Sequence, residues 1–207
     1  MNDLSTLDRF KPSVVAVITE TGFADRREPI TPQGMSDGTL ISFDQSLANT
    51  GYVVLDYDSV VGISILEMDV IHTMSRYGNK SWEDTLDRCT QLLQKVLELL
   101  LKFRPTLILH EVPPVGRGMY RAESSTVTAT VIRCVGYSEK IPVSMVSAQR
   151  VKKCLTGDGN AKKRLVREAL EKRFEVQLKT PGLKKTEHGF DALGIIVTFL
   201  EDLPKYN

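Results

Sequence analysis

Three carboxylates lie beside runs of apolar residues, where packing of a hydrophobic core alone gives no reason for an acid. Asp44 ends the run 40–43, Glu111 follows the run 107–109, and Asp191 lies among apolar residues near the start of the last helical pattern. An ionised carboxylate near a core is costly unless it is paired or binds a metal. Oxygen ligands suit Mg²⁺ or Mn²⁺ better than zinc, and carboxylate clusters that hold two such ions support in-line hydrolysis of phosphodiesters. Taken singly, each acid also fits a solvated strand end or a helix start.

His188 precedes Asp191 by three residues, so a helix would place both side chains on one face. A neutral imidazole there could bind a metal or accept a proton from an attacking water, although an isolated histidine is more often a surface residue. His110 should point away from Glu111 by strand alternation, and we assign it no role. We expect His72 in a loop.

The residues that carry these groups must be positioned by strands and helices, and the sequence predicts both. We expect strands at 40–44, 51–56, 61–68, 106–109 and 143–146, and helices at 82–104, 123–137, 147–154, 161–174 and 187–203. Three strands joined by short connections, followed by alternating helices and strands, indicate an α/β fold. We expect a five-stranded mixed sheet with three antiparallel strands, then parallel ones, and helices on both faces. This is the order of the ribonuclease-H-like fold, in which the first and fourth strands are commonly neighbours, so that Asp44 and Glu111 would converge and Asp191 would face them.

The chain divides by composition into an arm and a body. Residues 1–38 form an N-terminal arm or linker, with a possible short strand at 14–19 and a segment rich in Pro, Gly and charge at 25–38. Residues 39–207 form the single domain that would carry the chemistry.

The net charge of +1 hides an uneven distribution. Residues 150–185 contain 12 basic and four acidic side chains, a local charge of +8 that leaves −7 for the rest of the chain. Such a segment could contact nucleic-acid phosphates, although a solvated helix face is the commoner outcome for a basic run.

Several classes of protein are excluded. No uncharged apolar stretch reaches the roughly 18 residues of a membrane span, and the N-terminus does not have the pattern of a signal peptide, so we expect a cytoplasmic protein with no membrane partner. The three cysteines are far apart, which argues against a disulfide scaffold or a cysteine-rich zinc site.

Four segments together resemble the motifs of RuvC-type Holliday junction resolvases, with the chain as a divergent, phage-like member. They are the acid, turn and Thr-Gly-Tyr of 43–52, the strand ending on Glu at 107–111, the basic Gly-x-Gly-x-Ala-x-Lys segment at 151–163, and the closing Asp-Ala-Leu of 188–194. Each segment is weakly specific alone, but all four occur in the family's order.

The resemblance implies an Mg²⁺-dependent endonuclease, with Mn²⁺ able to substitute, that acts as a homodimer and cuts a four-way DNA junction symmetrically. Asp44, Glu111 and Asp191 would hold two metal ions, and His188 would be a further ligand or an activator of the water. The expected DNA contacts come from the basic segment and from the loop after the fourth strand: Lys152, Lys153, Lys162, Lys163, Arg164, Arg117, Tyr120 and Arg121.

The chain departs from the family pattern in two places, and other functions stay open. Gln45 and Ser46 stand where the family usually has Pro-Gly, and the loop at 112–121 differs from the family's segment. One alternative is a nuclease for flaps, forks or other branched DNA, and another is a non-catalytic DNA-binding module on the same fold. An actin-like or sugar-kinase ATPase would need a second domain, for which 207 residues leave no room.

Overall fold

The computed structural model describes residues 37–58, 62–76, 82–113, 119–175, 177–179 and 181–202, with only the backbone described for 119–123. The predicted arm, including the strand expected at 14–19, falls almost wholly outside these residues, and the division at residue 38 stays a prediction. Gly38 itself already belongs to the first strand.

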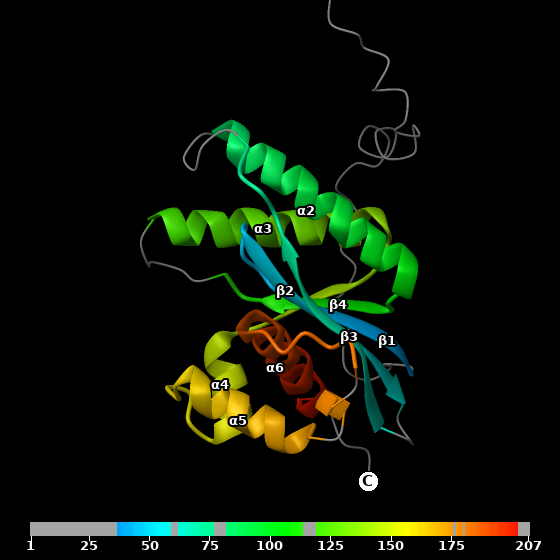
Figure 1. Cartoon of the computed structure of the whole chain (residues 1–207), viewed down its shortest axis with the longest axis vertical. Coiled ribbons are helices and arrows are strands. Elements are labelled where there is room, and N and C mark those ends of the chain that lie inside the picture. The colour runs from blue at the N-terminus through cyan, green and yellow to red at the C-terminus, as the bar shows by residue number, and fades with distance from the viewer. Residues whose placement is uncertain are drawn as a thin grey trace, which may run out of the picture.

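Five strands form one mixed sheet in the order β3-β2-β1-β4-β5 (Figure 1). Their bounds are Gly38–Asp44 (β1), Asn49–Asp58 (β2), Gly62–His72 (β3), Leu107–Glu111 (β4) and Val143–Val146 (β5). β1, β2 and β3 pair antiparallel, whereas β4 runs parallel to both β1 and β5. The predicted fold class is therefore confirmed, with β1 and β4 as neighbours.

The β2–β3 hairpin is longer than the sequence predicts, and His72 is a strand residue rather than a loop residue. The pairing continues to Asn49↔His72, and the side chains of these two residues are hydrogen bonded at 2.8 Å. Thr73 then holds the turn that follows β1, because its backbone N–H donates to Ala48 O and its hydroxyl donates to Leu47 O. Buried Val70 and Ile71 extend β3 beyond the predicted strand, and the polar contacts of Asn49, His72 and Thr73 hold its end.

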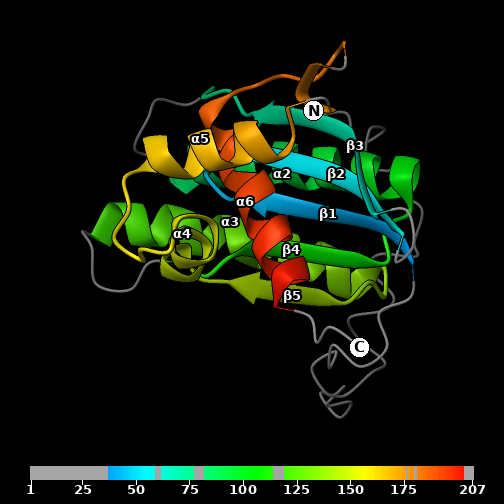
Figure 2. The same ribbon diagram turned by 90° about the horizontal axis from the view of Figure 1, so that it is seen from below.

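Helices cover both faces of the sheet. α2 (Trp82–Phe103) and α3 (Met119–Ser138) lie on one face, and α4 (Ala148–Thr156), α5 (Lys163–Arg173) and α6 (Glu187–Glu201) lie on the other (Figures 1 and 2). All five correspond to predicted helices, although α3 begins four residues earlier than expected. No helix in the described ranges is long and apolar enough to cross a membrane.

The alternation of side chains along β1 and β4 decides which groups reach which helices. Leu40 and Leu109 belong to the core under α4–α6, whereas Ile41 and Ile108 belong to the core under α2 and α3. By the same period of two, Asp44 and Glu111 point to the α6 face, and His110 points to the other. The sheet thus delivers two acids from adjacent strand ends to one side.

Candidate active site

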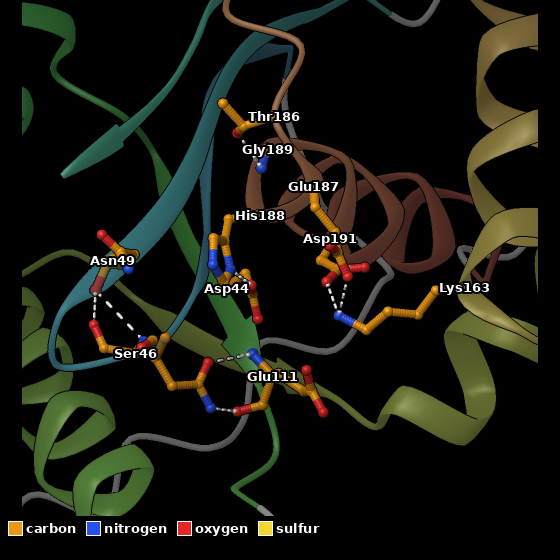
Figure 3. Close-up of polar contacts among 12 residues, drawn as sticks. Asp44, Ser46, Asn49, Glu111, Lys163, Thr186, Glu187, His188, Gly189 and Asp191 are labelled. Carbon is orange, nitrogen blue, oxygen red and sulfur yellow. Dashed lines mark hydrogen bonds and ion pairs between the residues drawn. The ribbon is translucent and has the colours of Figure 1, made fainter. Parts of the chain in front are cut away.

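The predicted acids meet at one end of the sheet, on the face covered by α6. Asp44 is the last residue of β1 and Glu111 the last of β4, directly after the paired residues Phe43↔His110. Asp191 approaches from the first turns of α6 (Figure 3). Asp44 and Asp191 are close enough to Glu111 to raise its pKa. Three of the candidate ligands therefore come together from segments up to 147 residues apart in sequence.

α6 is fixed against β1 and β2 by contacts that need particular residues. The buried hydroxyl of Ser42 donates to the carbonyl of Ala192 at 2.7 Å, and Thr186 caps the helix by accepting from the N–H of Gly189. Gly51 of β2 lies so close to the first turn that a Cβ there would stand 2.2 Å from the carbonyl oxygen of His188. The glycine therefore permits the close approach that sets the height of His188 and Asp191 over the sheet.

Around Glu111, the negative charge of the neighbouring acids outweighs the positive charge of the nearby lysines. Burial, followed by the negative charges of Asp44 and Asp191, raises its pKa to about 7, against smaller opposing effects from Lys163 and Lys152. Burial also raises the pKa of Asp44, although the hydrogen bond from His188 opposes that shift. A cation would stabilise this cluster, because it would let all three carboxylates ionise together.

His188 contacts Asp44 directly. Its Nδ1 lies 2.8 Å from Asp44 Oδ2, and an ionised carboxylate can only accept, so the proton of a neutral ring is placed on Nδ1. Nε2 then keeps its lone pair, and the side chain is 38% exposed. The ring can therefore accept a proton at Nε2 while Asp44 stabilises the charge that results.

Lys163 has a role that the sequence does not predict. Its ammonium pairs with Asp191 and lies 3.3 Å from Glu187 Oε1, rather than projecting as a free phosphate contact. Burial lowers its pKa, but the hydrogen bonds with Asp191 and Glu187 and the charges of Asp191 and Asp44 outweigh this effect, and the net pKa shift is upward. Lys163 thus supplies a cation beside Asp191, and Glu187 is a site neighbour that sequence reasoning missed.

The donor set fits a divalent metal ion, although the side chains are not gathered around one point. Among the described residues, no three histidine, cysteine or acidic side chains are arranged to hold a metal ion in this conformation. The acids nevertheless provide oxygen donors on three elements, and burial, followed by the charges of Asp44 and Asp191, raises the pKa of Glu111 despite the opposing lysines. Oxygen donors with net negative charge are what Mg²⁺ and Mn²⁺ require.

The predicted DNA contacts divide into three groups. Lys152 lies near enough to Glu111 to affect its pKa, and Lys153 and Lys162 are exposed and form no ion pair within the described ranges. Arg164 pairs with Glu168 one turn along α5. Arg117 and the side chains of Tyr120 and Arg121 fall outside the described residues, so their roles stay predictions.

The raised pKa of Glu111 predicts how the stability of the metal-free protein depends on pH. A carboxyl that binds its proton more tightly when folded stabilises the protein below its unfolded pKa, near 4.5, and loses that contribution as the pH rises through 7. We expect the free energy of unfolding in EDTA to fall by about 2 kcal/mol between pH 5 and pH 8, after allowance for partial solvent screening. Urea denaturation across this range measures the change.

Two glutamine substitutions separate Glu111 from other titrating groups. Glu111→Gln should flatten the pH dependence, whereas Glu98→Gln, at an exposed glutamate on α2, should leave it as in the unmodified protein. An equal slope in all three proteins would show that Glu111 titrates at its ordinary pKa.

Comparison with known proteins identifies relatives over the same residues that form this fold. The family model described as crossover junction endodeoxyribonuclease RuvC matches residues 40–199. A crossover junction endodeoxyribonuclease RuvC of Prochlorococcus marinus (strain AS9601) is 29% identical over 167 residues, covering 79% of this chain and 96% of the relative. The enzyme of the same name from Acidovorax sp. (strain JS42) is 26% identical, covering 77% and 82%.

Solved structures support the fold. T. thermophilus RuvC in complex with Holliday junction substrate superposes with a TM-score of 0.64 at 20% identity, covering 78% of this chain and 92% of the other. The yeast mitochondrial Holliday junction resolvase Ydc2 gives a TM-score of 0.52 at 17% identity, covering 84% and 82%. At these identities the structural likeness concerns the fold alone.

Proposed function

Because the chain belongs to the RuvC family of crossover junction endodeoxyribonucleases, we propose that it is a nuclease that resolves four-way DNA junctions by paired phosphodiester hydrolysis. The observation that carries the proposal is the convergence of Asp44, Glu111 and Asp191 at one end of the sheet, within the residues that the family model matches. Carboxylates of this kind, brought together at neighbouring strand ends, suit metal-assisted phosphoryl transfer.

Family membership implies a divalent metal ion, and we assign its ligands to the three acids, with Mg²⁺ as the ion and two ions per site. Bound there, the ions would lower the pKa of the attacking water and stabilise the leaving oxygen. His188 accepts the proton of that water at Nε2, while its Nδ1–H remains hydrogen bonded to Asp44. The water oxygen bonds to phosphorus as the P–O bond to the leaving sugar oxygen breaks. Lys163 holds Asp191 in place and adds positive charge near the phosphate.

A symmetric junction needs two such sites, and we propose that a homodimer provides them. The outer face of α3 supports this assembly, because Thr130, Cys134 and Tyr137 follow one another at helical spacing, are exposed and carry no charge, and the neighbouring Arg133 donates to His110 of β4. A second copy packed on this surface would cover Tyr137, which is 72% exposed.

Cleavage of a panel of labelled DNAs in Mg²⁺ tests the function. We expect paired, symmetric nicks in a four-way junction, and little cutting of linear duplex. Preferential cutting of flaps or forks would favour the alternative branched-DNA nuclease. Binding of the junction without any cutting, together with no Mn²⁺ binding in calorimetry, would favour a non-catalytic DNA-binding module.

The exposed lysines near the site should contribute to DNA affinity through phosphate contacts. We expect Lys153→Ala and Lys162→Ala each to weaken junction binding and to reduce the slope of log K against log salt concentration by about one. Lys179→Ala is the matched control, because that ammonium is already paired with Glu175. Fluorescence anisotropy at several salt concentrations in EDTA measures the slopes, and equal slopes in all variants would contradict these contacts.

A further inference from the structure

Gln45, the residue that follows Asp44, is joined to the backbone of Glu111 by two hydrogen bonds. Its side-chain amide accepts from the Glu111 N–H at 3.0 Å and donates to the Glu111 carbonyl at 2.6 Å (the dashed lines at Glu111 in Figure 3). The side chain is only 6% exposed. A buried amide that satisfies one donor and one acceptor of the same residue fixes that residue in both position and orientation.

These bonds continue the sheet past the end of a strand. The parallel pairing of β1 with β4 stops at Phe43↔His110, one residue before Glu111. Val112, the next residue, gives its N–H to Val146 on the β5 side, so alternate residues serve opposite neighbours. The N–H and carbonyl of Glu111 therefore face the β1 side after β1 has ended, and the Gln45 amide takes the place of the missing strand.

The Glu111 carbonyl is also held from its other side. His110 Nδ1 lies 2.7 Å from it, and Arg133 Nε donates to His110 Nε2 at 3.0 Å, which places the ring proton on Nδ1. The carbonyl thus accepts two hydrogen bonds, from Gln45 and from His110, and its two lone pairs are used. Of the two donors, only Gln45 is the chain neighbour of Asp44, so only Gln45 links the backbone of Glu111 to Asp44.

We propose that Gln45 is a positioning residue for the cleavage reaction, which holds the Glu111 carboxylate level with that of Asp44. The inference rests on the proposed function. It concerns a feature of this chain in particular, because Gln45 stands where the resembled family usually has proline, whose side chain has no amide. The bonds act before any metal or DNA binds, so they preorganise two ligands contributed by different strands.

Gln45→Met tests the proposal, because methionine fills a similar volume but forms neither hydrogen bond. We expect the single-turnover cleavage rate at saturating protein and Mg²⁺ to fall by about 10²-fold, as for a misplacement of about 1 Å, while the Kd for the junction in EDTA is unchanged. Amide hydrogen exchange at Glu111, followed by NMR in the metal-free protein, should be faster. Gln45→Asn, which keeps the amide but is too short to form both bonds, should change both measurements in the same direction.

Gln177→Met is the matched control. The Gln177 amide forms the same kind of pair with β3, donating to Ile63 O at 2.8 Å and accepting from Ile65 N at 3.2 Å, but it binds no acid-bearing residue. It should lower thermal stability without lowering the cleavage rate.

Wild-type cleavage by Gln45→Met, or an equal rate loss in Gln177→Met, would overturn the proposal. If the unmodified protein cuts no junction, the proposed function fails, and Glu111 exchange alone decides whether Gln45 holds that backbone.

Discussion

Asp44→Asn is expected to abolish junction cleavage while junction binding survives. The substitution keeps the size of the side chain and an oxygen that can accept from His188, but it removes the negative charge beside Glu111 and His188. Losing one preorganised charge-stabilising group typically lowers a rate 10²–10³-fold, and Asp44 is proposed both to bind metal and to orient the base, so we expect a loss on the order of 10³-fold or more. Single-turnover cleavage in Mg²⁺ and anisotropy in EDTA measure the two properties separately.

Binding should persist, and even strengthen, because the site repels phosphate when no metal is present. Removing one of three neighbouring carboxylates lowers that repulsion and lets Glu111 ionise nearer its ordinary pKa. Asp191→Asn should lose cleavage in the same way. Asp56→Asn is the control, since Asp56 pairs with Thr39 at the opposite end of the β1–β2 ladder and should cut normally. Full cleavage by Asp44→Asn would remove Asp44 from the active site.

The fold and the placement of two acids at strand ends could be predicted from the sequence, because both depend on local patterns. Apolar runs define the strands, and an acid at or just after the end of such a run lies at one end of the sheet. The parallel neighbours β1 and β4 then bring Asp44 and Glu111 together. The helical spacing of His188 and Asp191 likewise follows from four consecutive residues.

The contacts that organise the site could not be predicted, because they join residues with no common pattern. In the sequence, Lys163 is one of many basic residues in the segment 150–185. Only the packing of α5 beside α6 brings its ammonium to Asp191, 28 residues away in the chain. The sequence places Gln45 in a turn, but its hydrogen-bond partner Glu111 lies 66 residues further along the chain. The basic segment 150–185 likewise has fewer unpaired cations than its sequence suggests, because Arg164, Arg167 and Lys179 pair with nearby glutamates.

Gly51→Ala is expected to damage both stability and cleavage, although the change adds one methyl group. That methyl would stand 2.2 Å from the carbonyl oxygen of His188 and 2.7 Å from its Cβ, so backbone must move. The rest of α6 resists, because Ser42 holds Ala192 and the helix body is buried. We expect a loss of about 1–3 kcal/mol in urea denaturation, as in overpacked cores, and a cleavage rate lower by about 10²-fold.

Gly189→Ala separates crowding at this interface from a general intolerance of alanine in the first turn of α6. Its methyl would come within 2.8 Å of Cε and 3.1 Å of Cγ of Met68, an unbranched side chain with several rotatable bonds, and within 3.2 Å of Thr186 Oγ1, but it would meet no backbone atom this close. It should therefore cost less stability and leave most of the cleavage rate. If Gly51→Ala cut junctions normally, the height of α6 over the sheet would not control the site. A rate loss confined to Gly51→Ala would mean that β2, which contributes no acid to the site, nevertheless sets where His188 and Asp191 meet Asp44.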